Sequence, residues 1–301
     1  MPLPVYPVFE NLTLDMKHDL SSSLKHVPQA ISEFTFANLY LFRDTYSYKA
    51  SLLPDGNPVI SGVKNGEAFI LLPFGIPGDE ILFSLFTNHI YIKNLAQDFV
   101  QKHQIALERK GFCIVEDRDN FDYIYLKKDL ANLPGKKYHK KRNLVRQFMN
   151  NYEYRETKID SSNIRDVYRV LEMWGEDRTE NGDMTAAREA LELIDTLNLC
   201  GYIYYVDDAP AAYVLGEPIA RGKGFVVHFE KAVGSYKGIY QFINKAFASI
   251  LPAKYTFINR EQDLGDQGLR QAKMTYRPSG FVKKYRVYVE PTCPCCPCSD
   301  E

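Results

Sequence analysis

The sequence predicts an α+β protein with two tandem domains, residues 1–130 and 131–290, each built on a mixed, mostly antiparallel sheet flanked by helices. Three observations support this class. The 301 residues suffice for two medium-sized domains, and 45% hydrophobic residues can fill their cores. Short apolar runs bounded by Gly, Pro and Asn alternate with stretches of helical spacing. A basic segment, residues 127–146, marks a change of composition between the halves.

The first half reads as helices followed by an antiparallel meander. Apolar residues at helical spacing predict helices, and the turns P-D-G-N-P and K-N-G-E separate strand-like runs. Gly111 suits the left-handed residue that ends a helix. In chain order, the expected elements are helices over 13–24 and 31–43, strands over 48–53, 59–63 and 68–74, a helix over 95–109, and strands over 112–115 and 123–126.

The basic segment contains eight Lys and Arg residues and a single acidic residue, Asp129. An apolar stripe and the preceding L-P-G predict a helix with one basic face. Two interpretations stay open. The helix is a solvated linker, or its face, with Lys140, Lys141 and Arg142, binds phosphate, because clustered cations in a chain of net charge −1 are typical of phosphate partners.

The second half predicts the order strand, two helices, three strands, helix, strand, helix, strand. The expected elements are a strand over 152–157, helices over 164–174 and 186–196, strands over 201–206, 211–217 and 225–229, a helix over 239–251, a strand over 255–258, a helix over 269–276 and a strand over 281–289. A glycine-flanked loop, Gly234–Ser235–Tyr236–Lys237–Gly238, leads into the helix at 239. Unpaired N–H groups at a helix start, together with Lys237, favour a phosphate or pyrophosphate. The alternative is an ordinary strand–helix turn.

The N-terminal sequence, the longest apolar runs and the cysteines indicate the cellular setting of the protein. No basic region followed by an apolar core marks a signal peptide, and no apolar run approaches 18 residues, so we expect a soluble, cytoplasmic protein. Cys113 and Cys200 are expected to be reduced. The segment T-C-P-C-C-P-C-S-D-E predicts a flexible tail, residues 291–301, with binding of a soft metal as the weaker alternative and no metal site expected elsewhere.

Four segments together carry a family resemblance: "ISEFTFANLYLFRD", "KYHKKRNLVRQF", "HFEKA…YKGIYQFINKAFA" and "INREQDLGDQGLRQAKMTYRP". They resemble the bacterial phosphatidylglycerol lysyltransferase C-terminal domain over residues 28–290. The resemblance implies two tandem GNAT-like (N-acetyltransferase-like) domains, and kinship with lysylphosphatidylglycerol synthases and Fem-type transferases. It implies acyl-CoA or aminoacyl-tRNA as co-substrate, with no tightly bound cofactor. The family's lipid-modifying enzymes carry a large membrane-spanning part, which is not seen here.

Acyl transfer to an amine needs a base, an oxyanion donor and precise positioning. His228, Glu230 and Asp263 are the catalytic candidates, with His228 and Glu230 expected on one face of a strand. Polar residues after the next strand are expected to bind the acceptor: Asn259, Arg260, Glu261 and Lys273. For the His228–Glu230 pair the alternative is a structural hydrogen bond, and for Lys273 an aliphatic stem lying over apolar surface.

Three hypotheses of function follow. The first is an acyl- or aminoacyltransferase that uses direct transfer, makes transient contact with tRNA, and binds its donor only in the second domain. The second is a non-catalytic GNAT-like module that binds a small ligand. The third and weakest is metal handling by the Cys-rich tail.

Overall fold

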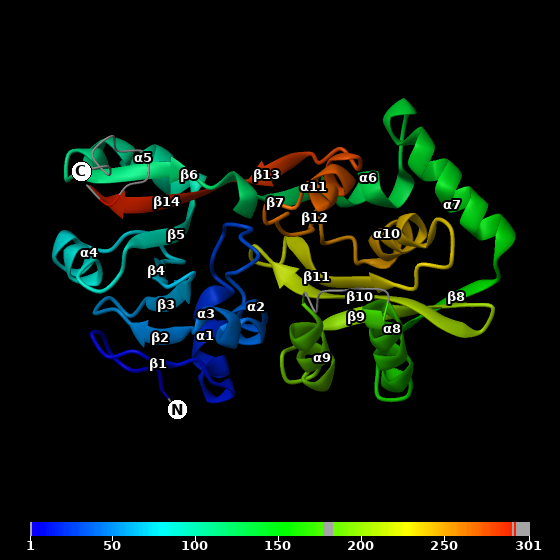
Figure 1. Cartoon of the computed structure of the whole chain (residues 1–301), viewed down its shortest axis with the longest axis horizontal. Helices are drawn as coiled ribbons and strands as arrows, with labels where there is room; N and C mark the ends of the chain where they lie inside the picture. The colour runs from blue at the N-terminus through cyan, green and yellow to red at the C-terminus, as the bar shows by residue number, and fades with distance from the viewer. Residues whose placement is uncertain (1, 177–182, 291, 293–301) are drawn as a thin grey trace. The chain divides into compact units, whose positions relative to one another are not determined.

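The computed structural model describes residues 2–176, 183–290 and 292, and it contains two seven-stranded sheets (Figure 1). The Cys-rich segment 293–301 lies outside the described residues. The predicted class is confirmed: both sheets are mixed and mostly antiparallel, and helices flank each of them.

The first sheet has the order β1-β2-β3-β4-β5-β14-β6. Its strands are β1 (Glu10–Asn11), β2 (Lys49–Leu52), β3 (Pro58–Lys64), β4 (Glu67–Leu71), β5 (Tyr91–Ala96), β6 (Phe112–Glu116) and β14 (Lys284–Val289). Its helices are α1 (Lys17–Leu24), α2 (Phe36–Leu41), α3 (Arg43–Tyr46), α4 (Asp79–Leu85) and α5 (Gln97–Glu108). Strands β2, β3 and β4 form the predicted antiparallel meander.

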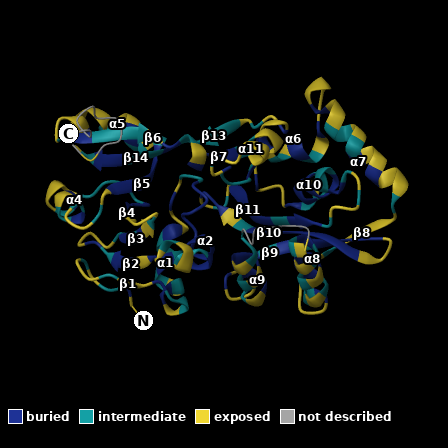
Figure 2. Ribbon diagram, viewed as in Figure 1, coloured by how far each residue is buried: buried dark blue, intermediate teal, exposed yellow. Residues whose placement is uncertain are grey.

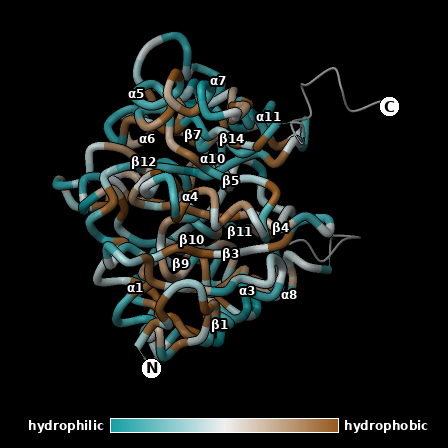
Figure 3. The backbone as a smooth tube through the Cα atoms, turned by 90° about the vertical axis from the view of Figure 1, so that its left-hand side faces the viewer, coloured by the Kyte–Doolittle hydropathy of each residue, from teal (hydrophilic) through white to brown (hydrophobic). Residues whose placement is uncertain are grey.

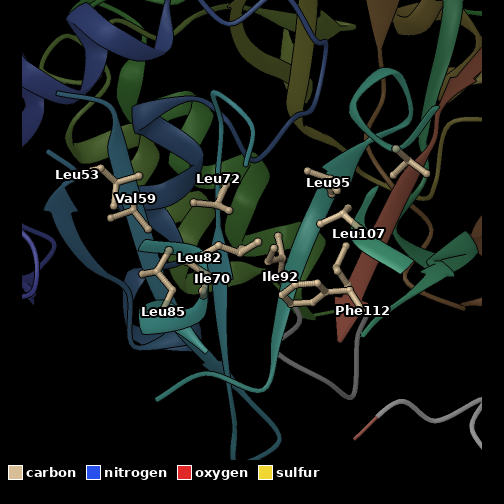
Figure 4. Close-up of a cluster of buried hydrophobic side chains, with 12 residues drawn as sticks. Leu53, Val59, Ile70, Leu72, Leu82, Leu85, Ile92, Leu95, Leu107 and Phe112 are labelled. Atoms are coloured by element: carbon tan, nitrogen blue, oxygen red, sulfur yellow. The ribbon is translucent and has the colours of Figure 1, made fainter. Parts of the chain in front are cut away.

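One face of this sheet is packed by α4 and α5. Leu82 and Leu85 of α4 and Leu107 of α5 are fully buried against Ile70 and Ile92 of the sheet, in the cluster drawn in Figure 4. Burial at about 25 cal/mol per Å² of apolar surface makes such clusters the main source of stability. Helix α4 and strand β5 were not predicted. In β5 the polar pair "KN" inside "YIKNLA" interrupts the apolar pattern.

The second sheet has the order β13-β7-β12-β11-β10-β9-β8. Its strands are β7 (Asp122–Leu126), β8 (Tyr154–Lys158), β9 (Cys200–Val206), β10 (Ala209–Ile219), β11 (Gly224–Ala232), β12 (Phe257–Asn259) and β13 (Gly280–Val282). The helices are α6 (Lys127–Asn132), α7 (His139–Asn151), α8 (Ile164–Glu176), α9 (Met184–Glu192), α10 (Ile239–Ile250) and α11 (Gln267–Met274). Helix α8 packs on one face, while α10 and α6 pack on the other (Figure 1).

The two sheets repeat one topology. In each, one pair of neighbouring strands runs parallel and is joined by a helix: α4 links β4 to β5, and α10 links β11 to β12. A parallel pair needs such a crossover connection. The repeat agrees with tandem GNAT-like domains.

The halves exchange one strand. β14, near the end of the chain, pairs with β5 and β6 of the first sheet, whereas β7 pairs with β12 of the second. The compact units are therefore residues up to Asp122 with 262–266 and 281 onward, and residues 123–261 with 267–280. These units differ from the predicted division at residue 130, and the predicted strand 281–289 is split between β13 and β14. A strand-like sequence pattern alone does not reveal which sheet the strand joins.

Burial and hydropathy follow this layout. Buried residues concentrate on the strands, and exposed residues dominate helices such as α7 (Figure 2). Hydrophilic and hydrophobic stretches alternate along the chain (Figure 3). Within the described ranges, none of the helices has both the length and the apolar character to cross a membrane.

The two cysteines outside the tail differ. Cys113 on β6 forms a disulfide, so the prediction of a reduced thiol is wrong there. Cys200 is free, and burial raises the pKa of its thiol.

Candidate active site

A β-bulge in β11 lies at the centre of the candidate site. Phe229 pairs with Leu215, but Val227 pairs with the next residue, Gly216, so His228 is the extra residue. The bulge turns His228 toward Glu217 on the face of α8, while Glu230 stays on the face of α10. The prediction that His228 and Glu230 share one face is therefore wrong, because it assumed regular alternation.

His228 is held between two carboxylates. Its Nδ1 lies 2.8 Å from Oε1 of Glu261, and its Nε2 lies 3.0 Å from Oε1 of Glu217. Burial alone would lower the pKa of His228, but hydrogen bonds and charges from the two carboxylates outweigh burial and raise it to about 10. The side chain is 2% exposed. The pairing of both ring nitrogens with carboxylates favours an imidazolium that donates both protons, an arrangement that does not support a role for His228 as general base.

The backbone around Glu261 is fastened by two of the predicted acceptor residues. The Glu261 N–H donates to Oδ1 of Asn259 over 2.7 Å, and Nζ of Lys273 donates to the carbonyls of Arg260 (2.8 Å) and Glu261 (3.1 Å). Glu261 itself has a positive φ of 55°. Asn259 and Lys273 are both buried, so their role here is to hold the Glu261 turn in place.

On the opposite face of the sheet, Glu230 forms an ion pair with Arg260. Nη2 of Arg260 lies 2.8 Å from Oε1 of Glu230, and Nδ2 of Asn244 donates to Oε2 over 2.9 Å. Burial raises the pKa of Glu230, against the opposing effects of Arg260, Lys273 and Asn244. These residues line a small cavity with Val227 and others from α6, α10 and β12. Its space of about 10 Å³ is close to the minimum for one water molecule.

Strands β11 and β12 separate just before His228. β11 and β12 pair only as far as Val226 and Asn259, and β11 then continues to Ala232 paired with β10. Both charged groups, His228 on one face and Glu230 on the other, lie just beyond the last paired residues.

Aromatic rings and a lysine of α7 border Arg260. The guanidinium carbon lies 5.2 Å from the ring centre of Tyr276 and 6.0 Å from that of Tyr125. Nζ of Lys141 lies 4.0 Å from the Tyr276 ring centre, a cation–π distance. Burial, and then the charge of Arg260, lower the pKa of Lys141.

The other basic residues of α7 differ from Lys141. Nη1 of Arg142 donates to the carbonyls of Leu133 (2.5 Å) and Gly135 (2.6 Å), so this side chain secures the connection between α6 and α7. Its predicted role as a phosphate ligand is not supported, because its charged head is directed at the main chain. Lys140 is exposed on the helix surface.

The predicted phosphate loop is open to solvent but backed by a helix. Gly234, Ser235 and Lys237 are exposed, and Tyr236 packs edge-on against Tyr152. Gly238 begins α10 with φ of 90°, and a Cβ there would lie 2.6 Å from the Leu144 carbonyl of α7. A residue other than glycine would clash with α7 here. Phosphate binding by this loop stays a prediction.

Asp263 belongs to the first unit, not to the unit that holds His228 and Glu230. Its carboxylate is fully buried, lies 3.3 Å from Nη1 of Arg118, and accepts the Gly265 N–H over 3.0 Å. This arrangement stabilises a turn, which argues against the predicted catalytic role.

The first unit contains a second buried charged cluster that the sequence did not indicate. Nζ of Lys284 lies 2.5 Å from Glu33 and 2.8 Å from Asp122, and Ser32 donates to Asp122 from its N–H (2.8 Å) and hydroxyl (3.0 Å). Lys284 and Asp122 have fully buried side chains. Burial raises the pKa of Asp122 to about 6 despite Lys284. Lys284 on β14 thereby anchors the exchanged strand in its sheet.

Two residues of the second unit's site were missed in the sequence. Glu217 sits in the apolar run "YVLGEPI", and Asn244 lies on the buried face of "IYQFINKAF". A single polar residue in an apolar element is the signal that could have found both, since buried polar groups need partners. Among the described residues, no cluster of His, Cys, Asp and Glu could hold a metal ion.

The chain matches a known protein family over most of its length. The family model described as "Phosphatidylglycerol lysyltransferase, C-terminal" matches residues 24–288. An uncharacterised protein of Mycoplasmoides gallisepticum is 24% identical over 177 residues, a match that spans 56% of this chain and only 56% of that protein.

Two solved structures are similar over most of the chain. A conserved protein of unknown function from Bacteroides thetaiotaomicron has a TM-score of 0.84 and 29% identity, covering 96% of this chain and all of that one. The C-terminal domain of a putative lysylphosphatidylglycerol synthetase from Agrobacterium fabrum has a TM-score of 0.62 and 12% identity, covering 92% of each. At 12% identity, this second likeness concerns the fold alone.

Proposed function

Since the chain belongs to the family of phosphatidylglycerol lysyltransferase C-terminal domains, we propose that it is a transferase acting on an amine or hydroxyl acceptor. The group transferred is an aminoacyl group from aminoacyl-tRNA or an acyl group from acyl-CoA. The family and the GNAT-like fold support the reaction class. The site supports it through one observation, the negatively charged cluster of Glu217, His228 and Glu261.

This cluster suits a cationic amine. Two carboxylates and one imidazolium carry one net negative charge in a buried setting. In the described part of the chain, Glu217 hydrogen bonds only to His228, and only through Oε1. Its other oxygen is available to an ammonium group, which would offset the excess charge. His228 fixes the orientation of both carboxylates.

Direct transfer requires that the ammonium lose a proton before it attacks. We assign this step to Glu217, because His228 is already protonated. The amine nitrogen forms a bond to the acyl carbon, and the carbonyl electron pair moves onto oxygen. When the tetrahedral adduct collapses, the bond to the tRNA ribose oxygen or to the CoA sulfur breaks. The nitrogen loses two protons in all: Glu217 takes the first and releases it to solvent, and the leaving group takes the second as the adduct collapses. No covalent enzyme intermediate forms.

The exposed surface of α7 supports a binding site for the aminoacyl donor. His139, Lys140 and Arg146 are exposed along this helix. Such a row of basic side chains supports transient contact with the phosphates of a tRNA acceptor end, since cations displace condensed counterions. Acyl-CoA as donor would instead use the loop Gly234–Gly238.

A binding module without activity is the second candidate. It is favoured by the complete pairing of His228, which leaves no neutral imidazole in the cluster. In this case the cluster would hold an amine ligand without reaction.

The test is transfer of label. We expect the protein, given labelled lysyl-tRNA or acetyl-CoA and a panel of primary amines, to produce labelled amide. Glu217→Gln should reduce the rate at least tenfold, because it removes the proton acceptor. Glu156→Gln, at an exposed position on the edge strand β8, is the matched control and should retain the rate. Amine binding without label transfer from either donor would establish the binding module instead.

A further inference from the structure

Arg260 and Lys141 have binding capacity that the protein does not use. A guanidinium offers five N–H donors, yet within the described residues the Arg260 side chain makes one hydrogen bond, to Glu230. Lys141 is half-buried over the Tyr276 ring and makes no hydrogen bond or ion pair with any described residue. Partly buried cations usually have a partner, because desolvation otherwise disfavours them.

The local charge is unbalanced. Arg260 and Lys141 are two cations, and the carboxylate bonded to Arg260 is Glu230. Two cations therefore share one carboxylate. A carboxylate ligand could accept from one of them, whereas a phosphate monoester or a pyrophosphate has enough acceptor oxygens to pair with both at once.

The cations are also held in place. Glu230 fixes Arg260 and is itself fixed by Asn244 of α10, and the Tyr276 ring lies beside both cations. A preorganised guanidinium matches phosphate geometry through two parallel hydrogen bonds.

We infer that Arg260 and Lys141 form a binding site for a dianionic phosphate group, with Arg260 as the fork and Lys141 as the second cation. The inference rests on the proposed function in assigning this phosphate to the donor. Of the predicted phosphate ligands Lys140, Lys141 and Arg142 on α7, it retains Lys141, and it locates the site beside β12.

Calorimetric titration with inorganic pyrophosphate at low salt tests the site. Lys141→Met retains the stem over Tyr276 and should weaken binding about tenfold, the effect of losing one charge-assisted contact. Lys158→Met, at an exposed position on the edge strand β8, is the matched control and should change affinity less than twofold. Equal affinities for the two variants would overturn the inference, as would failure of the unmodified protein to bind pyrophosphate.

Two further titrations identify which donor molecule supplies the phosphate. Coenzyme A and the trinucleotide CCA are titrated in the same way, and the ligand whose affinity depends on Lys141 is the source. Arg260→Lys keeps the pairing charge for Glu230 but loses the fork, so it should also weaken pyrophosphate binding. Trp174 emission confirms that each variant is folded. Because no turnover is measured, loss of label transfer and loss of phosphate binding are separate results.

Discussion

The imidazolium of His228 makes the stability of the second unit depend on pH in a way that can be calculated. Its pKa rises from an ordinary 6.5 to about 10 in the folded protein. At about 1.4 kcal/mol per pKa unit, this corresponds to roughly 5 kcal/mol of stabilisation. Because the folded-state pKa is the higher one, the stabilisation is complete below pH 6.5 and is lost as pH rises toward 10. Between pH 7 and pH 9 the loss should be roughly 2.5 kcal/mol.

His228→Gln removes this titration and supplies the comparison. Urea unfolding is followed by emission of Trp174, the single tryptophan of the chain, which lies in α8 of the second unit. The difference in unfolding free energy between the unmodified protein and the variant should shrink by roughly 2.5 kcal/mol from pH 7 to pH 9. Titrating groups that do not contact His228 cancel in this difference. A difference that stays constant over this range would show that His228 is not held as an imidazolium.

Three more outcomes are expected. Lys284→Met leaves two buried carboxylates without their cation and should lower the unfolding free energy by about 3–5 kcal/mol in urea titrations. Gly238→Ala should lower the melting temperature, because it meets both a positive φ and the α7 backbone, whereas Gly280→Ala, which has open space, should not. Replacing Lys140 and Arg146 together by Glu should weaken tRNA binding and flatten its salt dependence, and an unchanged filter-binding slope would refute a tRNA contact there.

The local sequence pattern was sufficient to predict most helices and strands of the fold. The meander β2–β3–β4 and the order β9–β10–β11–α10–β12–α11 follow from apolar spacing and turn residues, which act over a few positions. The exchange of β7 and β14 could not be predicted in this way. Both read as ordinary strands, and their sheets are set by long-range pairing, such as that between Lys284 and Ala96.

The site shows the same limit at the level of single residues. His228, Glu230, Arg260 and Glu261 were singled out from the sequence as polar residues near strand ends. The sequence did not predict which of them contact one another, because the bulge at His228 turns this side chain to the opposite face of the sheet. Lys141 and Arg142 are neighbours of similar chemistry, yet one covers an aromatic ring and the other secures a loop. That difference arises from helix rotation and from packing partners distant in sequence.

The exchanged strand has a consequence for biosynthesis. β14 lies between β5 and β6, so the first sheet lacks an interior strand until the last part of the chain has left the ribosome. The amino-terminal half must therefore wait, partly assembled and with unpaired strand edges, while about 160 further residues are translated. A fragment cut after residue 130 would stay in that waiting state permanently, which makes it a poor candidate for separate expression.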